Sequence, residues 1–170
     1  EWWKLWLPAA AILVTTILYS WINYNGDISY GRLENIPYVT VQWYHALAPG
    51  VLLLLTRLGI PVSTTFLVLS AFATGIVFEK MLLKSMLGYA ISAVFAYAFW
   101  MALTKILDEK KKVKKEQEKY WRVAQWCTTG FLWFTWLTHD LANIAVFAPR
   151  QMSGIYVSGV IVLLTSLLAF

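Results

Sequence analysis

The stretch that decides the fold lies near the start of the chain, at residues 5–22, and reads LWLPAAAILVTTILYSWI. No charged residue occurs between Pro8 and Tyr19, and tryptophans flank the run. A helix of about 20 apolar residues crosses the ~30 Å hydrocarbon layer of a bilayer, and tryptophan rings prefer the two interfaces. We therefore predict a membrane-spanning helix over residues 5–22.

The composition extends this prediction to the whole chain. Hydrophobic residues make up 59% of it, charged residues make up only 14%, and ten of the 170 residues are tryptophan. Soluble domains carry about a quarter of charged residues, so a soluble globular domain is excluded. We predict an all-α polytopic membrane protein, with the lipid bilayer of a plasma or inner membrane as its surroundings.

Further apolar stretches follow the first one. Residues 38–78 form an apolar region that a Gly-Ile-Pro break at 59–61 divides, and it is either a re-entrant helical hairpin or two full spans. Pro49-Gly50 shortens its first arm, which favours the hairpin. We expect the next span over residues 81–107, a break at Glu79-Lys80 before it, and more apolar segments over residues 123–170.

The charge is concentrated in one place, residues 108–122. Eight of the fourteen Lys and Arg residues lie between Lys105 and Arg122, directly between two apolar segments. This position predicts a cytoplasmic loop by the positive-inside tendency, and it argues against nucleic-acid binding. Two (i, i+4) pairs with the acid first favour a short solvated helix here: Asp108–Lys112 and Glu118–Arg122.

The first candidate site is the sequence GIPVSTT at residues 59–65. Pro61 ends the preceding helix, so Ser63, Thr64 and Thr65 fall in the first turn of the next one. The free N–H groups and the positive dipole end of such a turn bind anions, as the broken helices of transporters do. The alternative is an ordinary helix N-cap.

The second candidate site is the sequence THDLAN at residues 138–143. Asp140 and Asn143 are three residues apart and so share one helix face. A carboxylate in an apolar stretch costs about 2.5–3.5 kcal/mol and normally faces a cavity or a partner. Its oxygens suit Na⁺ or a proton, and the alternative is an ion pair with Arg150. His139 is either a proton relay or a hydrogen-bonded packing histidine.

Together these two motifs resemble the signatures of the inorganic phosphate transporter family, the sodium- or proton-coupled phosphate permeases. Residues 59–65 are similar to "G-x-PVSTTH", and residues 140–143, DLAN, are similar to the end of "GANDVAN". That family has two inverted repeats, and each repeat contains both motifs. A charged cytoplasmic loop separates the repeats. This chain departs from the family at two places: Phe66 replaces the family His, and Leu137-Thr138-His139 replaces Gly-Ala-Asn. The missing Asn bears on whether the coupling ion is Na⁺ or H⁺.

The resemblance implies a domain organisation. Residues 1–107 correspond to the end of a first repeat, residues 108–122 to the loop, and residues 123–170 to the start of a second repeat. We expect the chain, which begins without Met and stops in an apolar run, to be a piece of a longer protein. It would work with the remainder of that chain or with a homodimer mate.

The resemblance also implies uptake of inorganic phosphate coupled to Na⁺ or H⁺. Ser63, Thr64 and Thr65 would hold phosphate, while Asp140 and Asn143 would hold the cation or hydrogen-bond the phosphate. No covalent chemistry and no cofactor beyond the coupling ion are expected, so the chain would not be an enzyme. The alternatives are an accessory or structural membrane subunit of a larger complex, and a transporter of another oxyanion such as sulfate.

Overall fold

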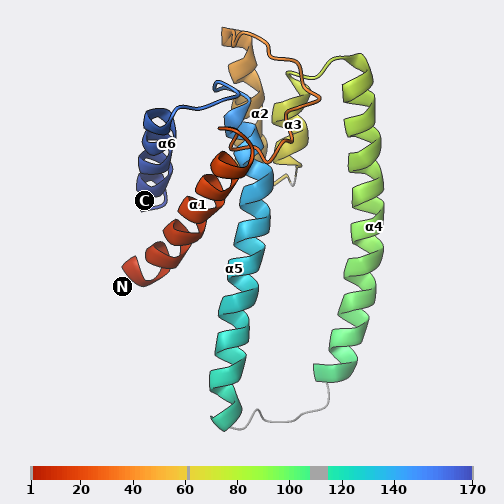
Figure 1. The fold of residues 1–170 in the computed structure, drawn as a ribbon. Helices are drawn as coiled ribbons and strands as arrows, with labels where there is room; N and C mark the ends of the chain where they lie inside the picture. The colour runs from red at the N-terminus through yellow and green to blue at the C-terminus, as the bar shows by residue number, and fades with distance from the viewer. Residues whose placement is uncertain (1, 61, 108–114, 170) are drawn as a thin grey trace.

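The computed structural model describes residues 2–60, 62–107 and 115–169, and every regular element within them is a helix (Figure 1). The predicted all-α fold class is therefore confirmed. The elements follow in the order α1 (Trp3–Asn23), η1 (Trp43–Ala46), α2 (Leu47–Arg57), α3 (Thr64–Ser70), α4 (Gly75–Leu107), α5 (Lys115–Ala145) and α6 (Gly154–Leu167).

Two of these helices are long and apolar enough to cross a membrane. They are α1, with 21 residues, and α4, over Gly75–Lys105. Every described side chain on α4 is exposed or half-buried within the chain, as in a helix surrounded by lipid. The helix α6 is also apolar but has only 14 residues. Length and composition thus agree with a membrane protein.

The start of α4 differs from the prediction. The helix begins at Gly75, where the N–H of Phe78 donates to the carbonyl oxygen of Thr74 at 2.9 Å, and it continues through Glu79 and Lys80 without a break. Glu and Lys are good helix formers, so charge alone does not end a helix there. The predicted boundary between 78 and 81 is wrong, and the break lies between α3 and α4.

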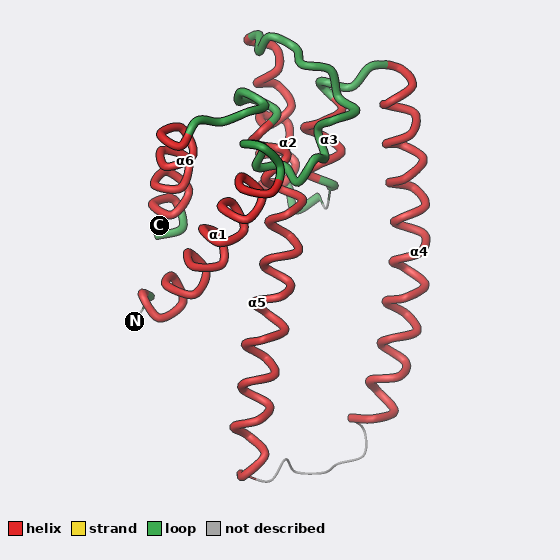
Figure 2. The backbone as a smooth tube through the Cα atoms, in the orientation of Figure 1, coloured by secondary structure: helices red, strands yellow, loops and turns green. Residues whose placement is uncertain are grey.

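The helices α2 and α3 form a short helical hairpin (Figure 2). With 11 and 7 residues they are about 17 and 11 Å long, well short of the ~30 Å hydrocarbon layer. Pro49 lies in the first turn of α2, where its missing N–H costs nothing. At the other end Gly59 has a φ of +72°, a value that glycine adopts without strain. The first arm of the hairpin thus ends just before Gly59, and Pro61 lies outside the described residues.

A structured polar loop connects α1 to η1. Asn25 and Gly26 form a turn in this loop, with φ values of 50° and 90°. Asp27 closes it by accepting hydrogen bonds from Ser29 N at 2.7 Å, Ser29 Oγ at 2.6 Å and Gly31 N at 3.1 Å. The N–H of Met152 donates to Gly26 O at 2.9 Å. The loop is thereby fixed to the segment that precedes α6.

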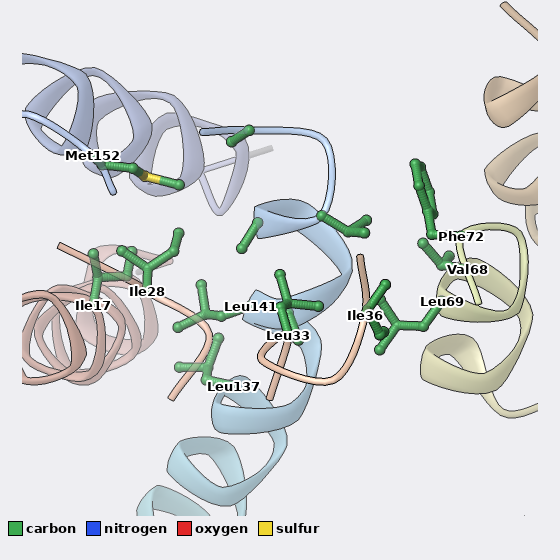
Figure 3. Packing of buried hydrophobic residues seen from close by; sticks show 14 of the residues in the cluster. Ile17, Ile28, Leu33, Ile36, Val68, Leu69, Phe72, Leu137, Leu141 and Met152 are labelled. Atoms are coloured by element: carbon green, nitrogen blue, oxygen red, sulfur yellow. The ribbon is translucent and has the colours of Figure 1, made fainter. Parts of the chain in front are cut away.

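The hydrophobic core surrounds the C-terminal third of α5 (Figure 3). Leu141 of α5 is 1% exposed and lies between two groups of side chains. Ile17 of α1 and Ile28 of the polar loop lie on one side, and Leu69 and Phe72 lie on the other. Burial on both sides fixes the position of this part of α5.

The charged segment is only partly described. The pair Asp108–Lys112 lies outside the described residues, whereas Arg122 and Glu118 form the predicted ion pair at 2.7 Å. These two residues belong to α5, which continues without interruption to Ala145, so the predicted boundary at residue 122 does not separate two elements. The adjoining ends of α4 and α5 lie at the opposite end of the molecule from the polar loop (Figure 1).

Candidate functional site

The first motif begins the helix α3 as the sequence predicts. Ser63 is its N-cap, and the Ser63 hydroxyl accepts a hydrogen bond from Phe66 N at 3.2 Å. The N-cap interpretation therefore holds for Ser63. Thr64 and Thr65 are the first two residues of α3, so their N–H groups have no acceptor within the helix. These two residues keep donor groups that the helix itself does not use.

The second motif lies in the last two turns of α5. Asp140 and Asn143 share one face, because Asn143 Nδ2 donates to Asp140 Oδ1 at 2.9 Å. Leu141 and Ala142 point into the core instead, with exposures of 1% and 0%. Burial of these two neighbours fixes the rotation of α5 about its axis, and this sets the side of the helix on which Asp140 and Asn143 lie.

The structure brings the two motifs together. The hydroxyl of Thr64 donates to Asp140 Oδ1 at 2.9 Å, across 76 positions of the sequence. Asn143 Nδ2 also approaches Thr65 Oγ1, at 3.4 Å. Four of the predicted site residues thus form one hydrogen-bonded group, and Ser63 contributes the helix cap beside it.

Two oxygen atoms of this group keep free lone pairs. Both donors reach Oδ1 of Asp140, so Oδ2 makes no hydrogen bond to any described residue. The amide oxygen of Asn143 is buried and likewise has no partner among the described residues. Carboxylate and carboxamide oxygens are ligands that suit a hard cation or a hydrogen-bond donor.

Arg150 does not neutralise Asp140, so the ion pair weighed as an alternative is wrong. Arg150 Nη2 donates instead to the carbonyl oxygens of Ile36 at 3.1 Å and Pro37 at 3.5 Å. Burial lowers the pKa of the Arg150 guanidinium, and the Asp27 carboxylate opposes this shift. Arg150 therefore binds the polar loop and forms no ion pair with Asp140.

His139 lies outside this hydrogen-bonded group. It is exposed, and its Nδ1 lies 2.9 Å from the carbonyl oxygen of Thr135, one turn earlier on α5. The ring is hydrogen-bonded, as the packing interpretation requires, but it does not lie in the core of the chain. Within the described residues no hydrogen bond joins it to Asp140 or Asn143, so the relay stays a prediction.

A cavity of about 560 Å³ adjoins the site. Its walls come from α1, α2, α3, α5 and α6 and from the residues just after α5 and α6. Among the described residues that line it, all are apolar except Thr64, Asp140 and Asn143. Trp133 and Trp136 stack on each other in this wall, with ring centroids 5.0 Å apart. Neither tryptophan was predicted as a site residue, although their (i, i+3) spacing indicates a shared helix face.

No family model, no curated protein and no solved structure matches this chain.

Proposed function

We propose that this chain is part of a secondary transporter that takes up inorganic phosphate together with Na⁺ or H⁺. The hydrogen bond between Thr64 and Asp140 carries the proposal. It joins the hydroxyl-rich start of a short helix to an acid–amide pair on a second helix, an arrangement that suits joint binding of an anion and a cation. The resemblance of both motifs to those of the phosphate permeases supports the same function.

Phosphate would be held mainly by hydroxyl groups. The helix α3 has only seven residues, so its dipole is weaker than that of a long helix. The hydroxyls of Thr64 and Thr65 and their backbone N–H groups supply the donors, and Ser63 holds the turn that presents them. Hydroxyls and N–H groups bind oxyanions without adding a positive charge, so neutralisation must come from the coupling ion.

The hydrogen bonds of Asp140 supply a mechanism for coupling. Thr64 and Asn143 both donate to its Oδ1, and an ionised carboxylate holds such donors strongly. A proton or Na⁺ on Asp140 weakens that hold and removes a negative charge that would repel phosphate. Thr64 and Asn143 can then donate to phosphate, so the cation and the anion favour each other's binding.

In the membrane, α1 and α4 would cross the bilayer, and α2 and α3 would form a re-entrant hairpin. Two arms of about 17 and 11 Å reach into the hydrocarbon layer and return. The lysine-rich segment would be cytoplasmic. The chain would belong to an inverted-repeat architecture, in which a longer chain or a second copy supplies the related pair of motifs.

Uptake of labelled phosphate into proteoliposomes tests this function. We expect accumulation driven by a Na⁺ gradient or by a pH gradient at equal Na⁺, and no inhibition by excess sulfate. Inhibition by sulfate would indicate a transporter of oxyanions in general. Absence of uptake under both gradients would contradict the proposal and favour an accessory subunit.

A further inference from the structure

We propose that the cavity beside Asp140 binds lipophilic organic cations, molecules in which apolar groups surround one positive charge. This inference goes beyond phosphate transport and does not depend on it. It rests on three properties of the cavity: its volume and apolar walls, the charge that lines it, and its pair of stacked tryptophans.

The size and the walls fit an organic ligand. Cavities that bind small molecules measure about 300–1,000 Å³ and are mostly apolar, with a few polar groups that orient the ligand. The volume here is about 560 Å³, and the three polar residues form a single group. The remaining wall includes Leu52 of α2, Leu137 of α5 and Leu164 of α6. Burial of apolar ligand groups against these side chains is favourable.

The charge selects a cation. Among the described residues that line the cavity, Asp140 is the only charged one. Its Oδ2 atom makes no hydrogen bond to a described residue, and Arg150 interacts with the polar loop instead. A charge of the same sign is strongly disfavoured beside a carboxylate in apolar surroundings, and a charge of opposite sign is favoured.

The tryptophan pair strengthens this selection. The indole N–H of Trp133 donates to the carbonyl oxygen of Ala9 at 3.1 Å, which fixes that ring. Trp136 stacks on it at an interplanar angle of 18° and remains half exposed. An indole face attracts a cation within about 6 Å of the ring, most strongly when the cation is desolvated.

Two ions of similar size and shape but opposite charge test the proposal: tetraphenylphosphonium and tetraphenylborate. Equilibrium dialysis with the purified, detergent-solubilised chain measures the binding of each, after subtraction of uptake by empty micelles. We expect the phosphonium to bind at least tenfold more tightly than the borate, from the electrostatic preference alone. Equal affinities, or tighter binding of the borate, would overturn the proposal.

Three variants locate the site. Asp140→Asn keeps an acceptor for Thr64 and should weaken phosphonium binding at least tenfold. Trp136→Leu should weaken it about fivefold. The matched control is Glu118→Gln, which removes an exposed acid on the same helix but outside the cavity and should change nothing. Equal losses in Asp140→Asn and Glu118→Gln, or no loss in Asp140→Asn, would refute the site.

The comparison of the two probes on the wild-type chain decides the matter if Asp140→Asn fails to fold. The result is also independent of phosphate transport. A chain that transports no phosphate can still prefer the phosphonium, and a phosphate transporter can still show no preference between the probes.

Discussion

The hydroxyl of Thr64 donates a 2.9 Å hydrogen bond to Oδ1 of Asp140, and so joins the start of the α2–α3 hairpin's second arm to the last turns of α5. A hydrogen bond to a carboxylate contributes about 1.5–3 kcal/mol, more than one between neutral groups. The two residues therefore influence each other energetically, and any ion that binds Asp140 alters the environment of Thr64.

Asp140→Asn should abolish gradient-dependent phosphate uptake. The substitution preserves size and hydrogen bonding, since the amide oxygen still accepts from Thr64, but it removes the charge that attracts the coupling cation. Proteoliposome uptake under Na⁺ and pH gradients measures the effect. Glu118→Gln is the control and should transport at the wild-type rate. Wild-type uptake by Asp140→Asn, with normal expression, would contradict the shared site.

Thr64→Val should weaken the apparent affinity for phosphate while leaving some transport at high substrate concentration. Valine preserves the shape of the side chain and removes its hydroxyl. We expect a loss of about 1 kcal/mol or more in binding, which corresponds to a several-fold higher half-saturation concentration. The matched control is Thr56→Val, whose hydroxyl bonds only to Leu52 O of its own helix. An equal effect in both variants would show that Thr64 has no specific role.

The sequence predicted those parts of the site that depend on local signals. Ser63 follows the Gly-Ile-Pro motif and caps α3, as the sequence indicates. The spacing of Asp140 and Asn143 alone places them on one helix face. Each of these features is decided by residues within one or two turns of the chain.

Features set by distant residues were not predictable from the sequence. Phe72 lies just after α3, stacks on the ring of His45 with centroids 4.4 Å apart, and meets the ring of Phe147 edge to face at 5.1 Å. These contacts lie at the break between α3 and α4. The four residues of that break, 71–74, include neither Gly nor Pro, so the sequence carries no local signal for it. The cavity was equally inaccessible to sequence reasoning, because its walls come from five helices.

Arg150→Ala should destabilise the fold although the residue lies outside the candidate site. The substitution removes the donor to Ile36 O and leaves that carbonyl without this hydrogen bond, which costs about 1–3 kcal/mol. Thermal unfolding of the purified protein measures the loss. Arg32→Ala, at an exposed position of the same loop, is the control and should stay within about 0.5 kcal/mol of the wild type. Equal melting temperatures for the two variants would contradict this role of Arg150.

Tyr30 should make stability depend on alkaline pH. Its hydroxyl donates to Thr16 O at 2.8 Å. Burial, followed by the neighbouring Tyr19 and Tyr24, raises the pKa of Tyr30 from 10.0 to about 12. The folded state therefore holds this proton more tightly than the unfolded state. The resulting stabilisation is complete below pH 10 and is lost as the pH rises through about 12.

Melting temperatures between pH 8 and pH 12 test this dependence. Tyr30→Phe should be less stable than the wild type at pH 8, by about 1 kcal/mol for the lost hydrogen bond. The difference should shrink as the pH rises from 10 to 12. Tyr38→Phe, at a side chain 67% exposed, should follow the wild-type curve. A constant difference for Tyr30→Phe over the whole range would contradict the raised pKa.

The final prediction concerns the orientation of the chain in the membrane. The lysine-rich segment should be cytoplasmic, because translocation of many cations is unfavourable, and the polar loop after α1 should then face the outside. In a Cys127→Ser background, cysteines introduced at Tyr120 and Asn35 report on opposite ends of the molecule, and both positions are exposed. A membrane-impermeant maleimide applied to intact cells should label Asn35→Cys and not Tyr120→Cys, and inside-out vesicles should show the reverse. Labelling of both positions from the outside would show that the segment between α4 and α5 is not separated from the polar loop by the membrane. That result would remove the basis for reading α4 as a span and for placing Asp140 between the two faces.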